Sequence, residues 1–206
     1  MCSEEKVRIV VNTRSLRSRG EFYLIDRFVK TLFDISLDRL FEILNAEIIC
    51  LDESCKHLFM IERSLLDKIR TLRERDVEVV SAGLRIGFIE SGKFIPTPLF
   101  LDLLYERLAT TRGAVIAGER GVKAFLYGND LLYESVIKIY EPFKRNHIVS
   151  IIDPEDGRVV GIGVATEDLE EILKWPRTRE YMIKPVVKNI FDLGFYLRAQ
   201  REEEYE

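Results

Sequence analysis

Hydrophobic residues near the start of the chain recur at spacings of three and four, which is the spacing of one face of an α-helix. The stripe consists of Phe22, Ile25, Phe28, Val29, Leu32 and Phe33. A second stripe, within Ser64 to Arg75, consists of Leu65, Leu66, Ile69 and Leu72. Both patterns predict amphipathic helices whose apolar faces point into a core.

Short apolar runs between and after these helices predict strands at Glu47–Leu51, His57–Ile61 and Val77–Val80. Thr97 followed by Pro98 is typical of a helix start, because the hydroxyl caps the helix and proline has no N–H to leave unpaired. We therefore predict a helix that ends at Leu108, preceded by a loop at residues 91–93. This part of the chain is predicted to be α/β or α+β.

The pattern changes at Ala114–Ala117, a predicted strand that leads into Gly118-Glu119-Arg120-Gly121, a predicted linker. We expect two domains that meet there. Residues 1–118 are expected to form an N-terminal α/β domain, with residues 1–20 as an extension of it. Residues 119–206 are expected to form a mixed β-barrel.

The strongest local signal in the second domain is a β-hairpin. Ile148–Ile152 is nearly all β-branched, the segment Pro154 to Gly157 has turn chemistry, and Val159–Ala165 returns as a second strand. Before the hairpin we predict a strand at Val122–Tyr127, a turn at Gly128-Asn129, and a short helix or turn through Ile139. After it we predict a helix capped by Thr166, a strand at Tyr181–Val187 and a helix at Ile190–Arg198.

Gly161 and Gly163 occupy alternate positions of the second hairpin strand, so one face of that strand carries no side chains. Another backbone can approach such a face closely. The approaching backbone belongs either to a packed element of the barrel or to a nucleic acid. The curvature of small barrels favours the first alternative, in which the glycines allow close packing within the protein.

Composition narrows the class of protein. The chain has 206 residues, of which 47% are hydrophobic, and its apolar runs are far shorter than the roughly 20 residues that span a bilayer. The N-terminal residues also lack the apolar stretch of a signal peptide. We therefore expect a cytoplasmic protein without a membrane partner. A charged fraction of 32% with a single glutamine, Gln200, is typical of hyperthermophile proteins.

Cys2, Cys50 and Cys55 are odd in number, and neither they nor His57 and His147 form a ligand repeat for zinc. We predict reduced, structural cysteines, no metal and no cofactor. No catalytic constellation is found either, because Ser135 and His147 fall in different elements and no phosphate-binding Gly-Lys-Ser string exists. The protein is therefore not expected to be an enzyme.

The net charge of -4 conceals a local excess of basic residues near the C-terminus. Between Ile172 and Arg201 only Glu180 and Asp192 oppose seven cations, which are Lys174, Arg177, Arg179, Lys184, Lys188, Arg198 and Arg201. Phosphate neutralisation supplies most sequence-independent affinity for nucleic acid, and an exposed aromatic ring can stack on an unpaired base. The candidate RNA-binding residues are Arg177, Arg179, Lys184, Lys188 and Trp175, near Tyr181. The alternative is a set of solvated charges around a core tryptophan.

The string Ala124-Phe125-Leu126-Tyr127-Gly128-Asn129-Asp130-Leu131-Leu132, followed by Val160-Gly161-Ile162-Gly163-Val164-Ala165, resembles the PUA domain. More narrowly, the Phe-Leu-Tyr-Gly-Asn string resembles the large-subunit ribosome biogenesis factors of the Nip-seven type, found in archaea and eukaryotes. Recognisable strings cover about Ser81 to Arg198.

The resemblance implies a monomeric, RNA-binding ribosome assembly factor that acts in large-subunit pre-rRNA processing, in an archaeal thermophile. Its implied partners are single-stranded pre-ribosomal RNA, other assembly factors and the RNA exosome. Lys138 corresponds to a basic position of the family's first PUA helix. Tyr133 and Glu134 depart from the family pattern, which puts RNA binding by that helix in question.

Two other functions remain open. PUA modules also accompany RNA-modifying enzymes, so the chain is alternatively an accessory subunit of one. The acidic net charge and the altered positions at Tyr133 and Glu134 favour instead a protein adaptor with lost or weak RNA binding.

Overall fold

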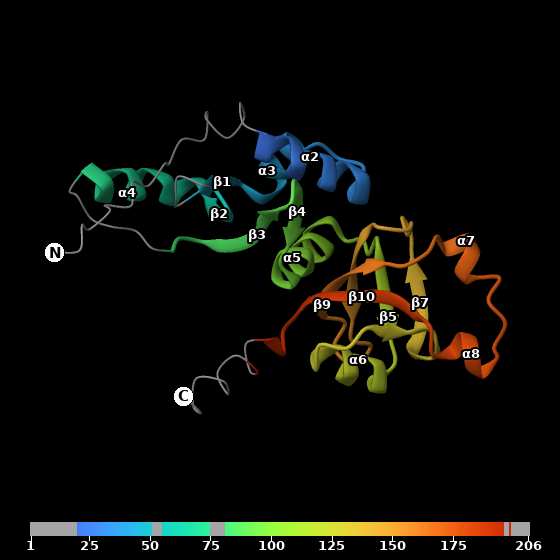
Figure 1. Ribbon diagram of the computed structural model, residues 1–206. Coiled ribbons are helices and arrows are strands. Elements are labelled where there is room, and N and C mark those ends of the chain that lie inside the picture. The colour runs from blue at the N-terminus through green and yellow to red at the C-terminus, as the bar shows by residue number, and fades with distance from the viewer. Residues whose placement is uncertain (1–19, 51–54, 75–80, 196–197, 199–206) are drawn as a thin grey trace. The chain divides into compact units, whose positions relative to one another are not determined.

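The computed structural model describes residues 20–50, 55–74, 81–195 and 198, and the chain divides into two compact units, Met1–Pro96 and Thr97–Glu206 (Figure 1). The predicted strand at Val77–Val80 and the predicted extension at residues 1–20 lie outside these ranges, except for Gly20. In the described part of the chain, no helix combines the length and the apolar character that a bilayer crossing requires.

The first unit contains a four-stranded sheet in the order β1-β2-β3-β4. Its strands are β1 (Ala46–Cys50), β2 (His57–Glu62), β3 (Leu84–Glu90) and β4 (Lys93–Pro96). Every neighbouring pair is antiparallel, so this unit is α+β and not α/β. Of the predicted loop at residues 91–93, Ser91 and Gly92 form the tight turn between β3 and β4 with positive φ, whereas Lys93 begins β4.

Within the described residues of this unit, three helices accompany the sheet: α2 (Gly20–Phe33), α3 (Leu37–Leu44) and α4 (Arg63–Glu74). The predicted stripe of α2 is confirmed for Ile25, Val29, Leu32 and Phe33, which are buried. In α4 only half of the prediction is right. Leu66 and Ile69 are buried against Ile49 and Ile61, whereas Leu65 and Leu72 are 39% and 40% exposed because they lie on the outer side of the helix.

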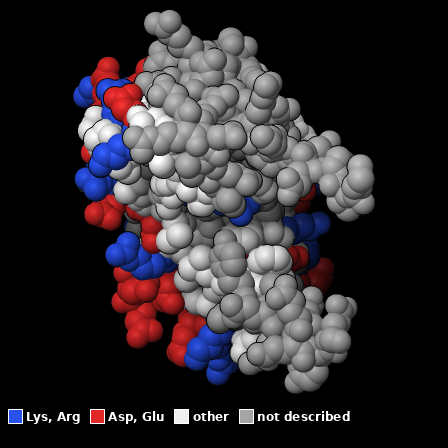
Figure 2. Space-filling model, turned by 90° about the vertical axis from the view of Figure 1, so that its left-hand side faces the viewer, with Lys and Arg blue, Asp and Glu red and all other residues white. Residues whose placement is uncertain are grey.

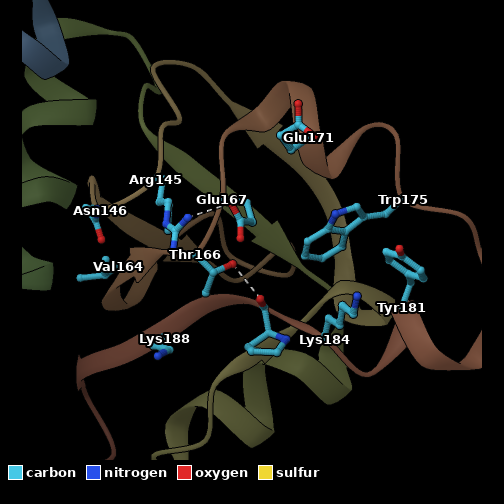
Figure 3. Close-up of a pocket in the computed structure, with 12 residues that line it drawn as sticks. Arg145, Asn146, Val164, Thr166, Glu167, Glu171, Trp175, Tyr181, Lys184 and Lys188 are labelled. Atoms are coloured by element: carbon cyan, nitrogen blue, oxygen red, sulfur yellow. Dashed lines mark hydrogen bonds and ion pairs between the residues drawn. The ribbon is translucent and has the colours of Figure 1, made fainter.

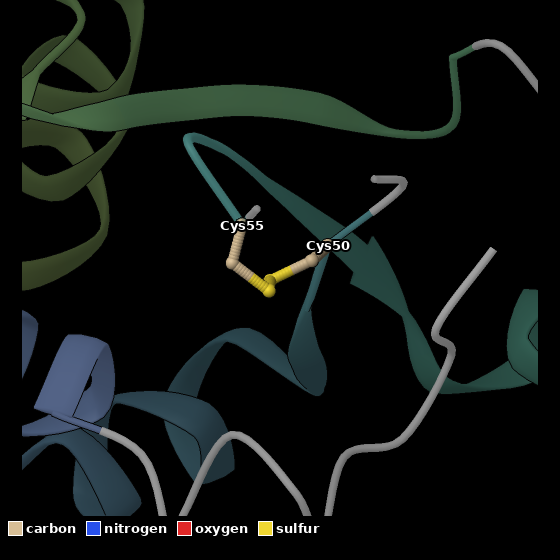
Figure 4. Close-up of a disulfide and its surroundings, with 2 residues drawn as sticks. All are labelled: Cys50 and Cys55. Carbon is tan, nitrogen blue, oxygen red and sulfur yellow. A yellow bond between two sulfur atoms is a disulfide. The ribbon is translucent and has the colours of Figure 1, made fainter. Parts of the chain in front are cut away.

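The prediction of reduced cysteines is wrong for two of the three. Cys50 ends β1, Cys55 precedes β2, and the two form a disulfide across the hairpin with their Cα atoms 5.0 Å apart (Figure 4). Antiparallel pairing of β1 with β2 brings these positions together, since Cys50 lies opposite Leu58. Spacing in the sequence could not show that pairing.

The second unit contains a six-stranded sheet in the order β6-β10-β9-β8-β5-β7. Its strands are β5 (Ala114–Ala117), β6 (Leu131–Leu132), β7 (Val136–Tyr140), β8 (Ile148–Ile152), β9 (Val159–Ala165) and β10 (Pro185–Asp192). The outer strands β6 and β7 are joined by the single 3₁₀ turn η1 (Tyr133–Ser135), so the sheet is curled until its two edges approach each other. The β8–β9 hairpin is confirmed, with Ser150 opposite Ile162.

In the part of this unit that the structure describes, the two longer helices are α5 (Pro98–Leu108) and α6 (Glu119–Leu126). The predicted start of α5 is confirmed, because the Thr97 hydroxyl accepts a hydrogen bond from the Phe100 amide at 3.3 Å. The predicted linker and the predicted strand at Val122–Tyr127 are wrong. Both segments form α6, whose Gly121, Val122 and Phe125 are spaced three and four apart and buried.

The remaining elements also differ from expectation. Lys138 lies on the strand β7, not on a helix. Thr166 does not cap a helix, because its hydroxyl donates to the carbonyl groups of Pro185 and Val186 while Asp168 precedes α7 (Leu169–Ile172). The predicted strand at Tyr181–Val187 is split between the short helix α8 (Arg179–Met182) and β10, which continues into the segment predicted to be the closing helix.

The glycine pair of β9 is required by packing. A Cβ atom at Gly161 would lie 2.6 Å from the Phe125 ring of α6 and 2.8 Å from the Phe191 carbonyl oxygen. A Cβ atom at Gly163 would lie 2.3 Å from the Lys188 carbonyl oxygen. The element that approaches this face is therefore the protein's own β10 together with α6.

The boundary expected after residue 118 does not coincide with the division of the chain at Pro96. Strand β5 lies before residue 118, yet it pairs with β7 and, in parallel, with β8 in the interior of the second sheet. The second unit therefore begins upstream of the expected boundary, with α5 and β5 as parts of it.

Candidate nucleic-acid interface

A pocket of about 580 Å³ opens where the segments before β8, after β9 and before β10 meet in the second unit (Figure 3). It is lined by Arg145, Asn146, Val164, Ala165, Thr166, Glu167, Glu171, Trp175, Tyr181, Lys184, Pro185 and Lys188. The lining therefore combines aromatic rings, cations and carboxylates, all placed by the ends of three strands and two short helices.

The aromatic wall is built around Trp175. Its ring meets Tyr133 edge-on at 5.5 Å between centroids and lies 5.8 Å from Tyr181. Trp175 is half-buried and packs partly against the core of the unit. Contacts of this kind fix the orientation of a large ring while part of it remains available to a ligand.

Lys184 places its ammonium group against this wall. Its Nζ atom lies 3.7 Å from the centre of the Tyr181 ring and 5.8 Å from that of Trp175. The carboxylate of Glu180 is 3.9 Å away, which is too long for a strong charge-assisted hydrogen bond. The cation is thus held by aromatic faces and remains able to bind an anion.

Two further cations line the pocket. Lys188 lies on β10 opposite Val164, is exposed, and forms no ion pair with any residue that the structure describes. Arg145 precedes β8, and its guanidinium is 3.7 Å from the Glu167 carboxylate. Its backbone amide donates to Asp168 at 2.8 Å, which ties the segment before β8 to the start of α7.

Thr166 lies at the floor of the pocket, where its hydroxyl links two strands. It donates to the Pro185 carbonyl at 2.8 Å and also lies 3.1 Å from that of Val186. These contacts join the end of β9 to the beginning of β10. Because the core residues Ala165, Val186 and Val187 are fully buried next to it, the floor is rigidly positioned.

The structure brings together only part of the predicted site. Trp175, Lys184 and Lys188 line the pocket. Arg177 and Arg179 are exposed but are not part of its wall. Lys138 lies on β7 with its ammonium 4.3 Å from the Tyr140 ring, and it is not part of the wall either.

Arg145, Asn146 and Glu167 also line the pocket, although they are not among the residues predicted from the sequence. Arg145 and Asn146 lie about forty positions before Lys188 in the chain, and only the pairing of β8 with β9 and of β9 with β10 brings them to the same place. Glu167 belongs to a run of acids that the sequence presents as a solvated face. A conspicuous Arg145-Asn146 pair directly before the predicted hairpin was the one available signal.

Charges of both signs are mixed on the surface as well as in the pocket. Figure 2 shows one face of the molecule on which Lys and Arg side chains lie among Asp and Glu side chains. The pocket itself has three cations against two carboxylates, Glu167 and Glu171. Of these, Glu171 is engaged by Lys174 at 2.6 Å. An excess of positive charge therefore remains at the mouth.

Within the described ranges, no group of three or more His, Cys, Asp and Glu residues is placed to hold a metal ion. His147 lies near the pocket, and burial, together with the nearby Lys144 ammonium, lowers the pKa of its imidazole, although the Asp168 carboxylate opposes the shift. The imidazole is therefore neutral at neutral pH and adds no charge to the interface.

Residues 113–201 match the model of the UPF0113 PUA domain. A UPF0113 protein of Archaeoglobus fulgidus is 35% identical over 120 residues, which are 58% of this chain and 63% of that protein. The match thus covers less than two thirds of the relative's length.

Solved structures that resemble the fold include two from archaea. A PUA domain from Aeropyrum pernix K1 has a TM-score of 0.57 at 18% identity, covering 94% of this chain and 90% of that chain. A hypothetical protein of the archaeon Pyrococcus horikoshii OT3 has a TM-score of 0.57 at 14% identity, covering 88% of this chain and 92% of that chain. The predicted PUA fold, with mixed α and β content and a curled sheet, is confirmed.

Proposed function

We propose that this PUA-domain protein binds RNA through the pocket formed by Trp175, Tyr181, Lys184, Lys188 and Arg145. The observation that carries the proposal is the position of Lys184, whose ammonium lies 3.7 Å from the Tyr181 ring inside a pocket of about 580 Å³. A cation beside an aromatic wall suits a nucleotide, because the phosphate binds the cation and the base stacks on the ring.

Unpaired RNA is the form that fits this arrangement. The bases of a duplex are stacked on one another and offer no free face to a protein ring, whereas a splayed base can enter a pocket of this size. Lys188 lies at the mouth without an ion pair to a described residue, so a backbone phosphate can reach it. The proposal is therefore a single-strand binding role.

We further propose that the RNA is pre-ribosomal and that the protein acts as a cytoplasmic assembly factor for the large subunit, without catalysis. The strings between Ser81 and Arg198 that resemble factors of the Nip-seven type support this proposal. The PUA domain supports the coarser part of it, which is RNA binding.

Fluorescence anisotropy with a labelled single-stranded oligoribonucleotide, measured over a range of salt concentrations, tests the proposal. The variant Lys184→Ala/Lys188→Ala should bind more weakly, and the slope of log K against log salt should fall by roughly 0.7 for each phosphate that the variant no longer neutralises. A matched control, Lys93→Ala/Lys123→Ala, removes two exposed cations elsewhere and should leave both quantities unchanged.

Two results would contradict the proposal. One is an unchanged affinity and salt slope in the folded Lys184→Ala/Lys188→Ala variant. The other is equal weakening in the Lys93→Ala/Lys123→Ala control, which would show a response to net charge alone. Either result would favour the adaptor function over RNA binding at this pocket.

A further inference from the structure

We propose that the pocket selects guanine, because Glu167 presents a carboxylate to the edge of the base that stacks on its aromatic wall. The inference rests on the proposed RNA-binding function and deepens it. A merely phosphate-binding surface would read no sequence, whereas a carboxylate inside a base-sized pocket distinguishes bases by their hydrogen-bond donors.

Glu167 is placed as a reading group. It follows the floor residue Thr166 directly, and in Figure 3 its side chain lies between Arg145 and the Trp175 ring. Its side chain is 38% exposed, and its nearest cation, Arg145, is 3.7 Å away. No hydrogen bond to its carboxylate comes from the residues that the structure describes.

The other acidic residue of the lining is occupied. Glu171 accepts a hydrogen bond of 2.6 Å from Lys174, and its side chain is 56% exposed. It lies on α7, four residues after Glu167 in the chain. Glu167 is therefore the carboxylate with capacity left for a ligand.

The chemistry of a carboxylate fits one base best. An ionised carboxylate only accepts hydrogen bonds, and its two oxygens accept two parallel N–H groups. Guanine offers two such adjacent donors, N1–H and the 2-amino group, on its Watson–Crick edge. Uracil offers one N–H flanked by carbonyl oxygens, and adenine and cytosine offer an amino group beside a ring nitrogen that repels the carboxylate.

The rest of the pocket completes a nucleotide site. Trp175 supplies the stacking surface, and Lys188 and Arg145 supply cations for the phosphate. Pockets of about 300–1,000 Å³ enclose small ligands, and the volume here, about 580 Å³, lies within that range. The charges of the lining are divided accordingly, with cations for the phosphate and an anion for the base.

The test uses the full chain and uridine oligoribonucleotides that carry one central guanosine, adenosine, cytidine, uridine or inosine. Inosine lacks only the 2-amino group of guanine. The guanosine oligomer should bind about tenfold more tightly than the adenosine, cytidine and uridine oligomers, and the inosine oligomer should have an intermediate affinity. Glu167→Gln should abolish this preference, because an amide offers one acceptor and one donor. The matched control is Glu170→Gln, which removes a nearby exposed carboxylate that does not line the pocket.

Free guanosine and adenosine monophosphates, measured by calorimetry, separate this inference from the proposed function. If RNA binds with equal affinity whatever the central base, or if Glu167→Gln keeps the preference, guanine selection is refuted while RNA binding stands. If guanosine monophosphate binds in preference and no RNA binds, guanine selection stands for a free nucleotide and the RNA proposal fails. If neither binds, both fail.

Discussion

At the scale of single residues, the glycine pair of β9 makes a direct prediction about stability. Gly163→Ala places a methyl group 2.3 Å from the Lys188 carbonyl oxygen, so β10 must move away from β9 or the ladder must distort. Overpacking of this kind costs about 1–3 kcal/mol. Urea unfolding followed by circular dichroism should show a decrease of this size in the free energy of unfolding.

Gly118→Ala is the control for this prediction, because its nearest neighbour outside the adjacent residues is 3.8 Å away and its φ of -67° is ordinary. Its cost should stay below about 1 kcal/mol, which is the range for replacing a glycine at a helix start. Equal stability of Gly163→Ala and the wild type would show that β9 and β10 are not as close as described.

Only those pocket residues that lie close together in the sequence could be predicted from it. Trp175, Lys184 and Lys188 belong to one basic segment, and charge counting found them. Arg145 and Glu167 belong to the pocket only through strand pairing. Arg177, between α7 and α8, and Arg179, the first residue of α8, are exposed and fall outside it. Local composition does not show which residues strand pairing brings into the pocket, nor which cations stay outside it.

At the scale of elements, the disulfide between Cys50 and Cys55 leads to a prediction about thermal stability. A bridge that closes so short a loop stabilises the folded state by about 2 kcal/mol on the chain-entropy model. Reduction with a phosphine should therefore lower the melting temperature of the wild type. Mass spectrometry after alkylation under non-reducing conditions should find Cys50 and Cys55 protected.

The variant Cys50→Ala/Cys55→Ala serves as the reference, because its melting temperature should not respond to the reductant. Alkylation of Cys50 and Cys55 in the untreated, unfolded wild type would show that the bridge is absent. In that case the melting curve should be insensitive to the reductant as well.

Helices and strands were predicted correctly where the sequence pattern was typical of one of them, and incorrectly where it was compatible with both. The helix α2 has a long apolar stripe, and the hairpin β8–β9 has a β-branched run followed by turn residues; both were correctly predicted. The run Val122–Tyr127 is short and apolar with two aromatic residues, which favours a strand on its own. It is a helix because Gly121, Val122 and Phe125 lie on one face, against β9 and the buried Leu131.

At the scale of the whole molecule, the position of β5 makes the third prediction. A fragment of residues 97–206 should fold alone, because it contains all six strands of the second sheet and α5. Helix α5 is bonded to that sheet, since Asp102 accepts from the Val159 amide at 2.9 Å and Tyr105 shares a hydrogen bond of 2.7 Å with Ser150.

A fragment of residues 119–206 should not fold, because it lacks β5, the strand between β8 and β7. Dispersion of amide resonances in NMR spectra compares the two fragments directly. A folded 119–206 fragment would restore the boundary expected after residue 118, and an unfolded 97–206 fragment would show that the second unit depends on the first.

The boundary expected after residue 118 differs from the division at Pro96 for a reason of topology. Glycines at positions 118 and 121 are typical of a linker, and the sequence around them contains no sign that β5 will pair with β8, more than thirty residues later. Parallel pairing needs a long crossover, so it leaves no local signature at either strand. The PUA resemblance identified the fold of this unit, but not where the unit begins.

The curl of the second sheet limits aggregation through its strand edges. Strands that end a flat sheet expose unpaired N–H and C=O groups, on which a neighbouring copy can add a strand and start a fibre. Here the outer strands are Leu131–Leu132, too short for such growth, and Val136–Tyr140, joined to it by one turn. The β-branched run Ile148–Ile152 has a composition that favours aggregation when exposed, and it is paired with a strand on both sides. The fold therefore keeps this run in the interior of the sheet, where a second copy of the chain cannot add a strand to it.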